Sequence, residues 1–110
     1  MAQLTVQHSS GTSGLTPTFS AATSTGDSYA NTGRETLQVK NAGAGSLTVT
    51  ITAQNPCNQG TLHTVTFTVA AGATMLLGPF GFQFYNDASG NVQITYPGGV
   101  TSLTVAVTSA

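Results

Sequence analysis

Charged side chains are nearly missing from this sequence. Its 110 residues include two Lys or Arg and three Asp or Glu, so that charged residues make up 5% of the chain, whereas about 25% is usual. Nucleic-acid binding draws most of its affinity from Lys and Arg placed against phosphates. Arg34 and Lys40 alone cannot form such a surface, so we expect no nucleic-acid partner.

Long apolar runs and paired cysteines are lacking as well. The apolar stretches are far shorter than the ~20 residues that span a bilayer, and the N-terminal MAQLTVQHSSG has no basic start followed by an apolar run, as a secretory signal would. We therefore expect no membrane partner and a protein made in the cytoplasm. Cys57 is the single cysteine, which excludes an internal disulfide and leaves an inert thiol or an intermolecular bridge as the alternatives.

Helical periodicity is also missing, because no window places apolar residues at helical spacing between a cap and a C-terminal Gly. Short stretches rich in Val, Ile, Thr, Phe and Tyr alternate instead, between clusters of Gly, Asn, Asp and Pro. This pattern is typical of an antiparallel β-sandwich or barrel. It predicts strands at 3–8, 16–22, 36–40, 47–53, 63–69, 73–78, 81–85, 91–96 and 102–108.

The length and the strand pattern predict one all-β domain over residues 15–110, preceded by a segment, 1–14, that is extended. Residues 9–33 are dominated by Ser, Thr, Gly and Ala, and we interpret them as an extended arm over the surface, with an edge strand and a loop as the alternative. The core is expected to contain the apolar residues on the inward faces of the strands: Leu4, Val6, Phe19, Leu37, Val39, Leu47, Val49, Ile51, Val65, Phe67, Val69, Leu76, Val92, Ile94, Tyr96, Leu103, Val105 and Val107.

The supply of residues for catalysis or metal binding is small. Cys57 and His63 are six residues apart, but no acidic or amide side chain is clearly placed to orient the imidazole. Asp87-Ala-Ser89-Gly-Asn91 looks like the start of a calcium loop, yet its Gly is misplaced and no carboxylate follows to complete the shell. We expect no enzyme activity, no catalytic residues, no cofactor and no metal.

The aromatic residues gather in one run, Phe80-Gly-Phe-Gln-Phe-Tyr85. If the segment is extended, Phe80, Phe82 and Phe84 share one face of it. That face is interpreted as core, with an exposed contact patch as the alternative.

Threonine takes the place that charged residues usually occupy on strands. In 47–53, Leu, Val, Ile and Ala alternate with Thr, and threonine packs well on a pleated surface and forms hydrogen bonds without carrying charge. A protein with few charges lacks the repulsion that keeps molecules apart, which suits a subunit packed against many neighbours. An extracellular module of low charge would share this composition.

The order of short motifs resembles small proteins encoded among the head genes of tailed bacteriophages, over about residues 15–110. The motifs are Asn31-Thr-Gly33-Arg34, Leu37-Gln-Val39-Lys40-Asn41, Leu47-Thr-Val49-Thr-Ile51, Val69-Ala-Ala-Gly72, Gly78-Pro79-Phe80, Tyr85-Asn86-Asp87, Gly90-Asn-Val92 and Thr101-Ser-Leu103-Thr-Val105. The resemblance implies a head decoration, or cement, protein: a small β-sandwich of jelly-roll type on the outer surface of the virion capsid.

Such a protein packs on the major capsid protein and on itself, commonly as a trimer, and stabilises the shell. Residues expected to contact these partners are Tyr29, Asn31, Arg34, Phe80, Phe82 and Tyr85; Arg34 can form a bidentate pair with a carboxylate of a capsid neighbour. Two alternatives remain open, a glycan-binding or adhesive module of a virion spike or tail, and a tail or connector subunit.

Overall fold

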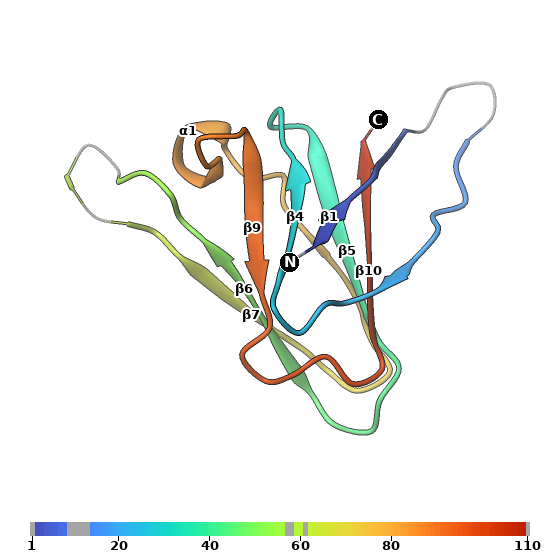
Figure 1. Cartoon of the computed structure of the whole chain (residues 1–110). Helices are drawn as coiled ribbons and strands as arrows, with labels where there is room; N and C mark the ends of the chain where they lie inside the picture. Colours follow the sequence, from blue (N-terminus) through green and yellow to red (C-terminus); the bar gives the residue numbers. More distant parts are fainter. Residues whose placement is uncertain (1, 9–13, 57–58, 61, 110) are drawn as a thin grey trace.

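Two β-sheets face each other in the computed structural model, which describes residues 2–8, 14–56, 59–60 and 62–109 (Figure 1). The first sheet has the order β1 (Ala2–Leu4), β4 (Asp27–Ala30), β9 (Asn91–Thr95), β6 (Leu47–Thr52) and β7 (Val65–Val69). The second has the order β2 (Val6–His8), β10 (Leu103–Ser109), β5 (Glu35–Asn41) and β8 (Thr74–Leu77), and β3 (Ser20–Ala21) also pairs with β10. The expected all-β, sandwich-like domain is confirmed.

The N-terminal strand passes from one sheet to the other at Thr5. Before it, β1 pairs in parallel with β4, and after it, β2 pairs in parallel with β10. The remaining ladders between the strands described above are antiparallel, as expected. The two sheets are therefore mixed, since this strand, within the segment expected to be extended, takes part in both.

Part of the segment interpreted as a surface arm belongs to the sandwich instead. β4 lies between β1 and β9 inside the first sheet, and the Tyr29 side chain is 0% exposed. The stretch Asp-Ser-Tyr-Ala has one large apolar residue and buries its Asp and Ser, so it shows no apolar alternation. β3 is the short edge strand of the alternative interpretation, and residues 9–13 lie outside the described residues.

The prediction of a strand at 81–85 is wrong, because Phe82–Tyr85 forms a short helix, α1. Its turn is closed by hydrogen bonds from the backbone N–H groups of Phe84 and Tyr85 to the Gly81 carbonyl, at 3.2 and 3.1 Å. Within the described parts of the chain, no helix has the length and hydropathy needed to cross a bilayer.

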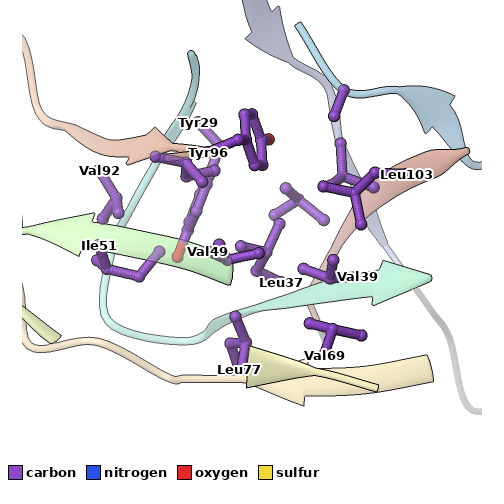
Figure 2. Packing of buried hydrophobic residues seen from close by; sticks show 14 of the residues in the cluster. Tyr29, Leu37, Val39, Val49, Ile51, Val69, Leu77, Val92, Tyr96 and Leu103 are labelled. Carbon is purple, nitrogen blue, oxygen red and sulfur yellow. The ribbon is translucent and has the colours of Figure 1, made fainter. Parts of the chain in front are cut away.

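Buried side chains from both sheets meet between the layers, where Figure 2 shows Leu37 and Val39 of β5 near Val49 of β6. Fully burying one such side chain contributes about 1.5–3 kcal/mol. Two expected core residues are wrong. Phe19 is half-buried outside the core, with Lys40 Nζ 5.9 Å from its ring centroid. Leu76 is 64% exposed, whereas Leu77 is 2% exposed and pairs with Leu37. A strand alternates its faces, so a one-residue error in register exchanges the buried and exposed neighbours.

Asn41, at the end of β5, ties together the two connections that cross between the sheets at one end of the sandwich. Its side-chain Nδ2 donates to the Gly45 carbonyl at 2.8 Å and to the Val69 carbonyl at 3.1 Å, and its Oδ1 accepts from the Gly43 N–H at 3.0 Å. Its own carbonyl accepts from the Gly72 N–H at 2.7 Å. The fully buried amide thus holds the β5–β6 and β7–β8 connections together.

Candidate contact surface

The opposite end of the sandwich carries α1, the turn between β4 and β5, and the beginning of the β6–β7 connection (Figure 1). The backbone N–H groups of Gln54 and Asn55 donate to the Phe84 carbonyl at 2.8 and 3.1 Å. The Tyr85 hydroxyl donates to the His63 carbonyl at 2.9 Å. These bonds fix α1 to the connection between β6 and β7. We call the exposed side chains of Arg34, Phe82 and Phe84 at this end the α1 surface.

A pair of asparagine side chains forms the base of this surface. Asn31 Nδ2 donates to the Phe80 carbonyl at 3.0 Å and to Asn86 Oδ1 at 2.8 Å, while its Oδ1 accepts from the Gly33 N–H at 3.1 Å. Asn86 Nδ2 in return donates to the Asn31 carbonyl at 2.8 Å. The two amides therefore join the β4–β5 turn to both ends of the segment that contains α1.

The Glu35 carboxylate accepts hydrogen bonds from residues of the β4–β5 turn. It accepts from the Thr32 N–H at 2.7 Å, from the Thr32 hydroxyl at 2.9 Å, and from the Arg34 N–H at 3.3 Å. Burial by itself raises the pKa of Glu35, but these hydrogen bonds outweigh burial and hold its pKa below the usual value. Because the carboxylate bonds to the turn, it supports the backbone beneath the exposed Arg34 side chain.

Three aromatic rings, one of them from Tyr85 of α1 itself, pack against one another beside the core. Phe80 is 7% exposed, with its ring centroid 5.3 Å from that of Tyr85 and 6.4 Å from that of Phe67, in tilted geometries that suit the charge distribution of the rings. Phe82 is 55% exposed and Phe84 is also exposed. Both would share a face with Phe80 in an extended strand, but the helical turn of α1 does not place alternate residues on one face. The aromatic run thus supplies both core and surface.

Gly33 brings the turn close to α1. Its φ is +93°, and a Cβ atom there would lie 3.6 Å from Phe82 Cδ1. Glycine adopts this left-handed conformation without the steric cost that other residues meet. The backbone of the turn therefore lies directly beside the exposed Phe82 ring.

The structure gathers most of the expected contact residues at this end, but only some have exposed side chains. Arg34 and Phe82 are exposed and Tyr85 is half-buried, whereas Asn31, Phe80 and Tyr29 are buried. The Tyr29 hydroxyl is buried without a hydrogen-bond partner, and burial, followed by the charge of Glu35, raises its pKa. Of the expected contact residues, Arg34, Phe82 and Tyr85 therefore remain candidates for contact with a partner.

Sequence reasoning did not identify the parts of this end that depend on tertiary contacts. Phe84 was expected to share a face with Phe80, and the roles of Glu35 and Asn86 were not expected at all. Asn86 directly follows the aromatic run, and its role becomes apparent only when β4 and the segment after α1 are neighbours.

The features considered for metal binding and catalysis have other roles or lie outside the described residues. Asp87 Oδ1 accepts from the backbone N–H groups of Ser89 and Asn91 at 2.8 and 3.0 Å, and its Oδ2 accepts from the Gln93 amide, so the segment forms the turn before β9. No group of three His, Cys, Asp or Glu able to hold a metal ion occurs in the part of the chain that the structure describes. Cys57, and with it the Cys57–His63 pair, lies outside that part.

The α1 surface offers one guanidinium and two aromatic rings, which is suited to binding a partner through apolar contact and charge-assisted hydrogen bonds. No protein-family model matches the chain, and neither a curated protein nor a solved structure shows significant similarity to it. The resemblance to phage head decoration proteins therefore rests on the short sequence motifs and stays a prediction.

Proposed function

We propose that this chain is a structural virion protein that decorates the capsid of a tailed phage and stabilises it by packing in several copies on the major capsid protein. The observation that carries the proposal is the α1 surface, where Phe82 is 55% exposed beside a turn that presents Arg34. Aromatic residues and Arg are enriched among the residues that dominate protein interfaces. The hydrogen-bonded side chains of Asn31 and Asn86 hold this surface before any partner binds, which lowers the entropic cost of binding.

A neutral sheet surface supports the same role. The threonines of β6 and β7 face each other on the outer side of the first sheet, with Thr50 Oγ1 and Thr66 Oγ1 at 3.1 Å. Hydroxyl groups can be buried against a neighbour at a smaller desolvation cost than ions. Several copies can therefore pack closely without repulsion between like charges.

Unpaired strand edges provide a second kind of contact. β7 is the last strand of the first sheet and β8 the last strand of the second, and Leu76 on β8 is exposed. An edge strand can accept a strand of another protein through main-chain hydrogen bonds. If one copy touches several capsid subunits, loss of one contact is intramolecular and quickly reversed, which gives tight retention from modest individual contacts.

The test is to add the purified chain to shells assembled from the major capsid protein of the same genome, and to measure occupancy by electron microscopy and heat resistance of the particles. We expect saturable occupancy at regular outer positions and an increase in the temperature at which shells open. Arg34→Gln and Phe82→Ala should each lower the affinity roughly tenfold or more, as hot-spot residues do. Lys40→Gln, which removes the other cation on an exposed strand position, is the matched control and should bind like the original chain.

Three results would contradict the proposal. Shells that remain bare at saturating protein concentration would exclude decoration. Saturable binding to a glycan array, without shell binding, would favour an adhesive module, and a large ring found by mass measurement in solution would favour a tail or connector subunit.

A further inference from the structure

A pocket of about 510 Å³ opens on the side of the sandwich where the N-terminal strand crosses from one sheet to the other. Its lining includes residues of β1, β2, β3 and β10, and Figure 1 shows these strands on the side of the sandwich away from α1. The Gln7 side chain spans one rim, because its Nε2 donates to the Thr18 carbonyl and its Oε1 accepts from the Thr18 N–H, both at 2.9 Å. The volume is in the range of pockets that bind small molecules.

Asp27 of β4 contributes to the wall of this pocket. Only one of its two carboxylate oxygens accepts hydrogen bonds. Its Oδ2 accepts from the Tyr96 hydroxyl at 2.6 Å and from the Thr23 N–H at 3.1 Å. Its Oδ1 is buried and has no hydrogen-bond partner, although the side chain is 0% exposed. A buried carboxylate oxygen without a donor is unfavourable, so this atom favours any ligand that brings one.

Tyr96 is the side-chain donor to Asp27. Burial, followed by the hydrogen bond to Asp27 and the charge of that carboxylate, raises the pKa of Tyr96. The phenol therefore stays protonated and remains a donor to Oδ2, and no Lys, Arg or His is among the residues that line the pocket.

The remaining walls divide into an apolar and a neutral polar part. The apolar part consists of Leu4, Ala21, Val105, Ala106 and Val107, and the polar part of Gln3, Thr5, Gln7, Thr18 and Ser20. Asp27 is thus the one charged residue among those that line the pocket. A Ca²⁺ ion needs six to eight oxygen ligands and Mg²⁺ an octahedral set, which a single carboxylate beside an aliphatic wall does not supply.

The geometry points to a binding site for a primary alkylammonium group, with the ammonium donating to Asp27 Oδ1 and the alkyl chain lying against Val105 and Val107. The positive charge would compensate the carboxylate, and a charge-assisted hydrogen bond is about twice as strong as a neutral one. A neutral alcohol would fill the same space but leave the charge unpaired. The inference does not depend on the proposed role at a capsid.

Because Asp27 is fully buried, the ligand has to displace part of the wall to reach it. β1 and β2 are the segments most easily moved, since each is three residues long and pairs with one neighbour. The half-buried Leu4 lies on β1. Ligand entry should therefore alter the N-terminal strand as well as β10.

The test is an NMR titration of the full chain at neutral pH with n-butylamine, n-butanol and tetramethylammonium, following backbone amide shifts. We expect saturable shifts at residues 3–7 and 105–107 with n-butylamine, and an affinity at least roughly tenfold weaker for n-butanol, because it lacks the charge-assisted bond. Tetramethylammonium has the charge without an N–H donor and should be similarly weak. These three arms need no variant, so they remain informative if a substitution prevents folding.

Two variants and one further probe complete the experiment. Asp27→Asn should abolish the preference for n-butylamine over n-butanol, whereas Asp87→Asn, the same change at a carboxylate outside the pocket, should preserve it. The further probe is a lysine with both ends capped, which distinguishes the source of the ligand. Binding as tight as that of n-butylamine assigns the site to a lysine side chain of another protein. No binding assigns it to a free amine. Equal binding of amine and alcohol, an unchanged preference in Asp27→Asn, or saturable shifts only outside the pocket would each overturn the inference.

Discussion

Replacement of Asn31 by Ala tests whether the buried amide holds the α1 end of the sandwich together. The change removes the bonds to the Phe80 carbonyl, to Asn86 Oδ1 and from the Gly33 N–H. The Phe80 carbonyl bond is buried, and leaving such an acceptor unpaired costs about 1–3 kcal/mol. The other two bonds are partly buried, so that water can replace Asn31, with a loss of roughly 0.5–1.5 kcal/mol each.

We therefore expect Asn31→Ala to lower the free energy of unfolding by about 2–6 kcal/mol, a large part of the roughly 5–15 kcal/mol that single domains have. Urea unfolding should show a lower midpoint with an unchanged slope, since the surface exposed on unfolding stays similar. Hydrogen exchange should accelerate at residues 81–86, because α1 loses its tie to the β4–β5 turn.

The control is Asn91→Ala, which removes an amide whose Oδ1, among the residues that the structure describes, accepts only from the exposed Gln3 side chain, at 3.3 Å. That variant should stay within about 0.5 kcal/mol of the original chain. Our reasoning would be refuted if Asn31→Ala cost no more than Asn91→Ala, or if exchange at 81–86 did not change.

Two further predictions concern the other end of the fold and the effect of acid. Asn41→Ala should lower the thermal midpoint by roughly 10 °C or more, because it leaves the buried Val69 carbonyl without a donor; calorimetry measures this, and a shift below about 2 °C would contradict it. Hydrogen bonds to the carboxylates lower the pKa of Glu35, against the effect of burial, and of Asp87, where the Asn91 N–H contributes most. Their stabilisation is present above the ordinary carboxyl pKa of about 4 and is lost as the pH falls through the lowered values. Urea midpoints should thus decline from pH 5 toward pH 2.5, and a flat or rising profile would show that these bonds do not stabilise the fold.

The strands that could be predicted from the sequence are those in which one face alternates clearly with the other. β6 alternates Val49 and Ile51 with threonines, and β10 places Val105 and Val107 on its inner face. β4 could not be recognised, because its buried Asp27 and Ser28 look like loop residues until Tyr96 and its strand neighbours are present. The inward faces of β6 and β10 were thus predicted correctly, whereas β4 was missed because its buried polar residues depend on tertiary partners, and β8 was predicted one residue out of register.

The aromatic run shows a second limit of sequence reasoning. Phe80, Phe82 and Phe84 fit a strand by alternation, and the choice of a helical turn depends on partners elsewhere in the chain, such as the His63 carbonyl that accepts from Tyr85. The motif residues Asn31 and Arg34 were expected to contact a partner, but only the fold brings them to the same end of the sandwich as Phe82. The Asp27 pocket was not foreseen at all, since its walls come from five separate strands and the segment before β3.

The position of β10 has a consequence for how the chain reaches its native state. This strand is made after every other strand, yet it lies in the middle of the second sheet, between β5 on one side and β2 and β3 on the other. A nascent chain still lacking residues 103–109 has no partner for β2 and exposes both flanks of the unfinished sheet. Completion of the sandwich must therefore wait until β10 has left the ribosome, and during that interval the apolar faces of β5 and β6 depend on dilution or on chaperones to avoid aggregation.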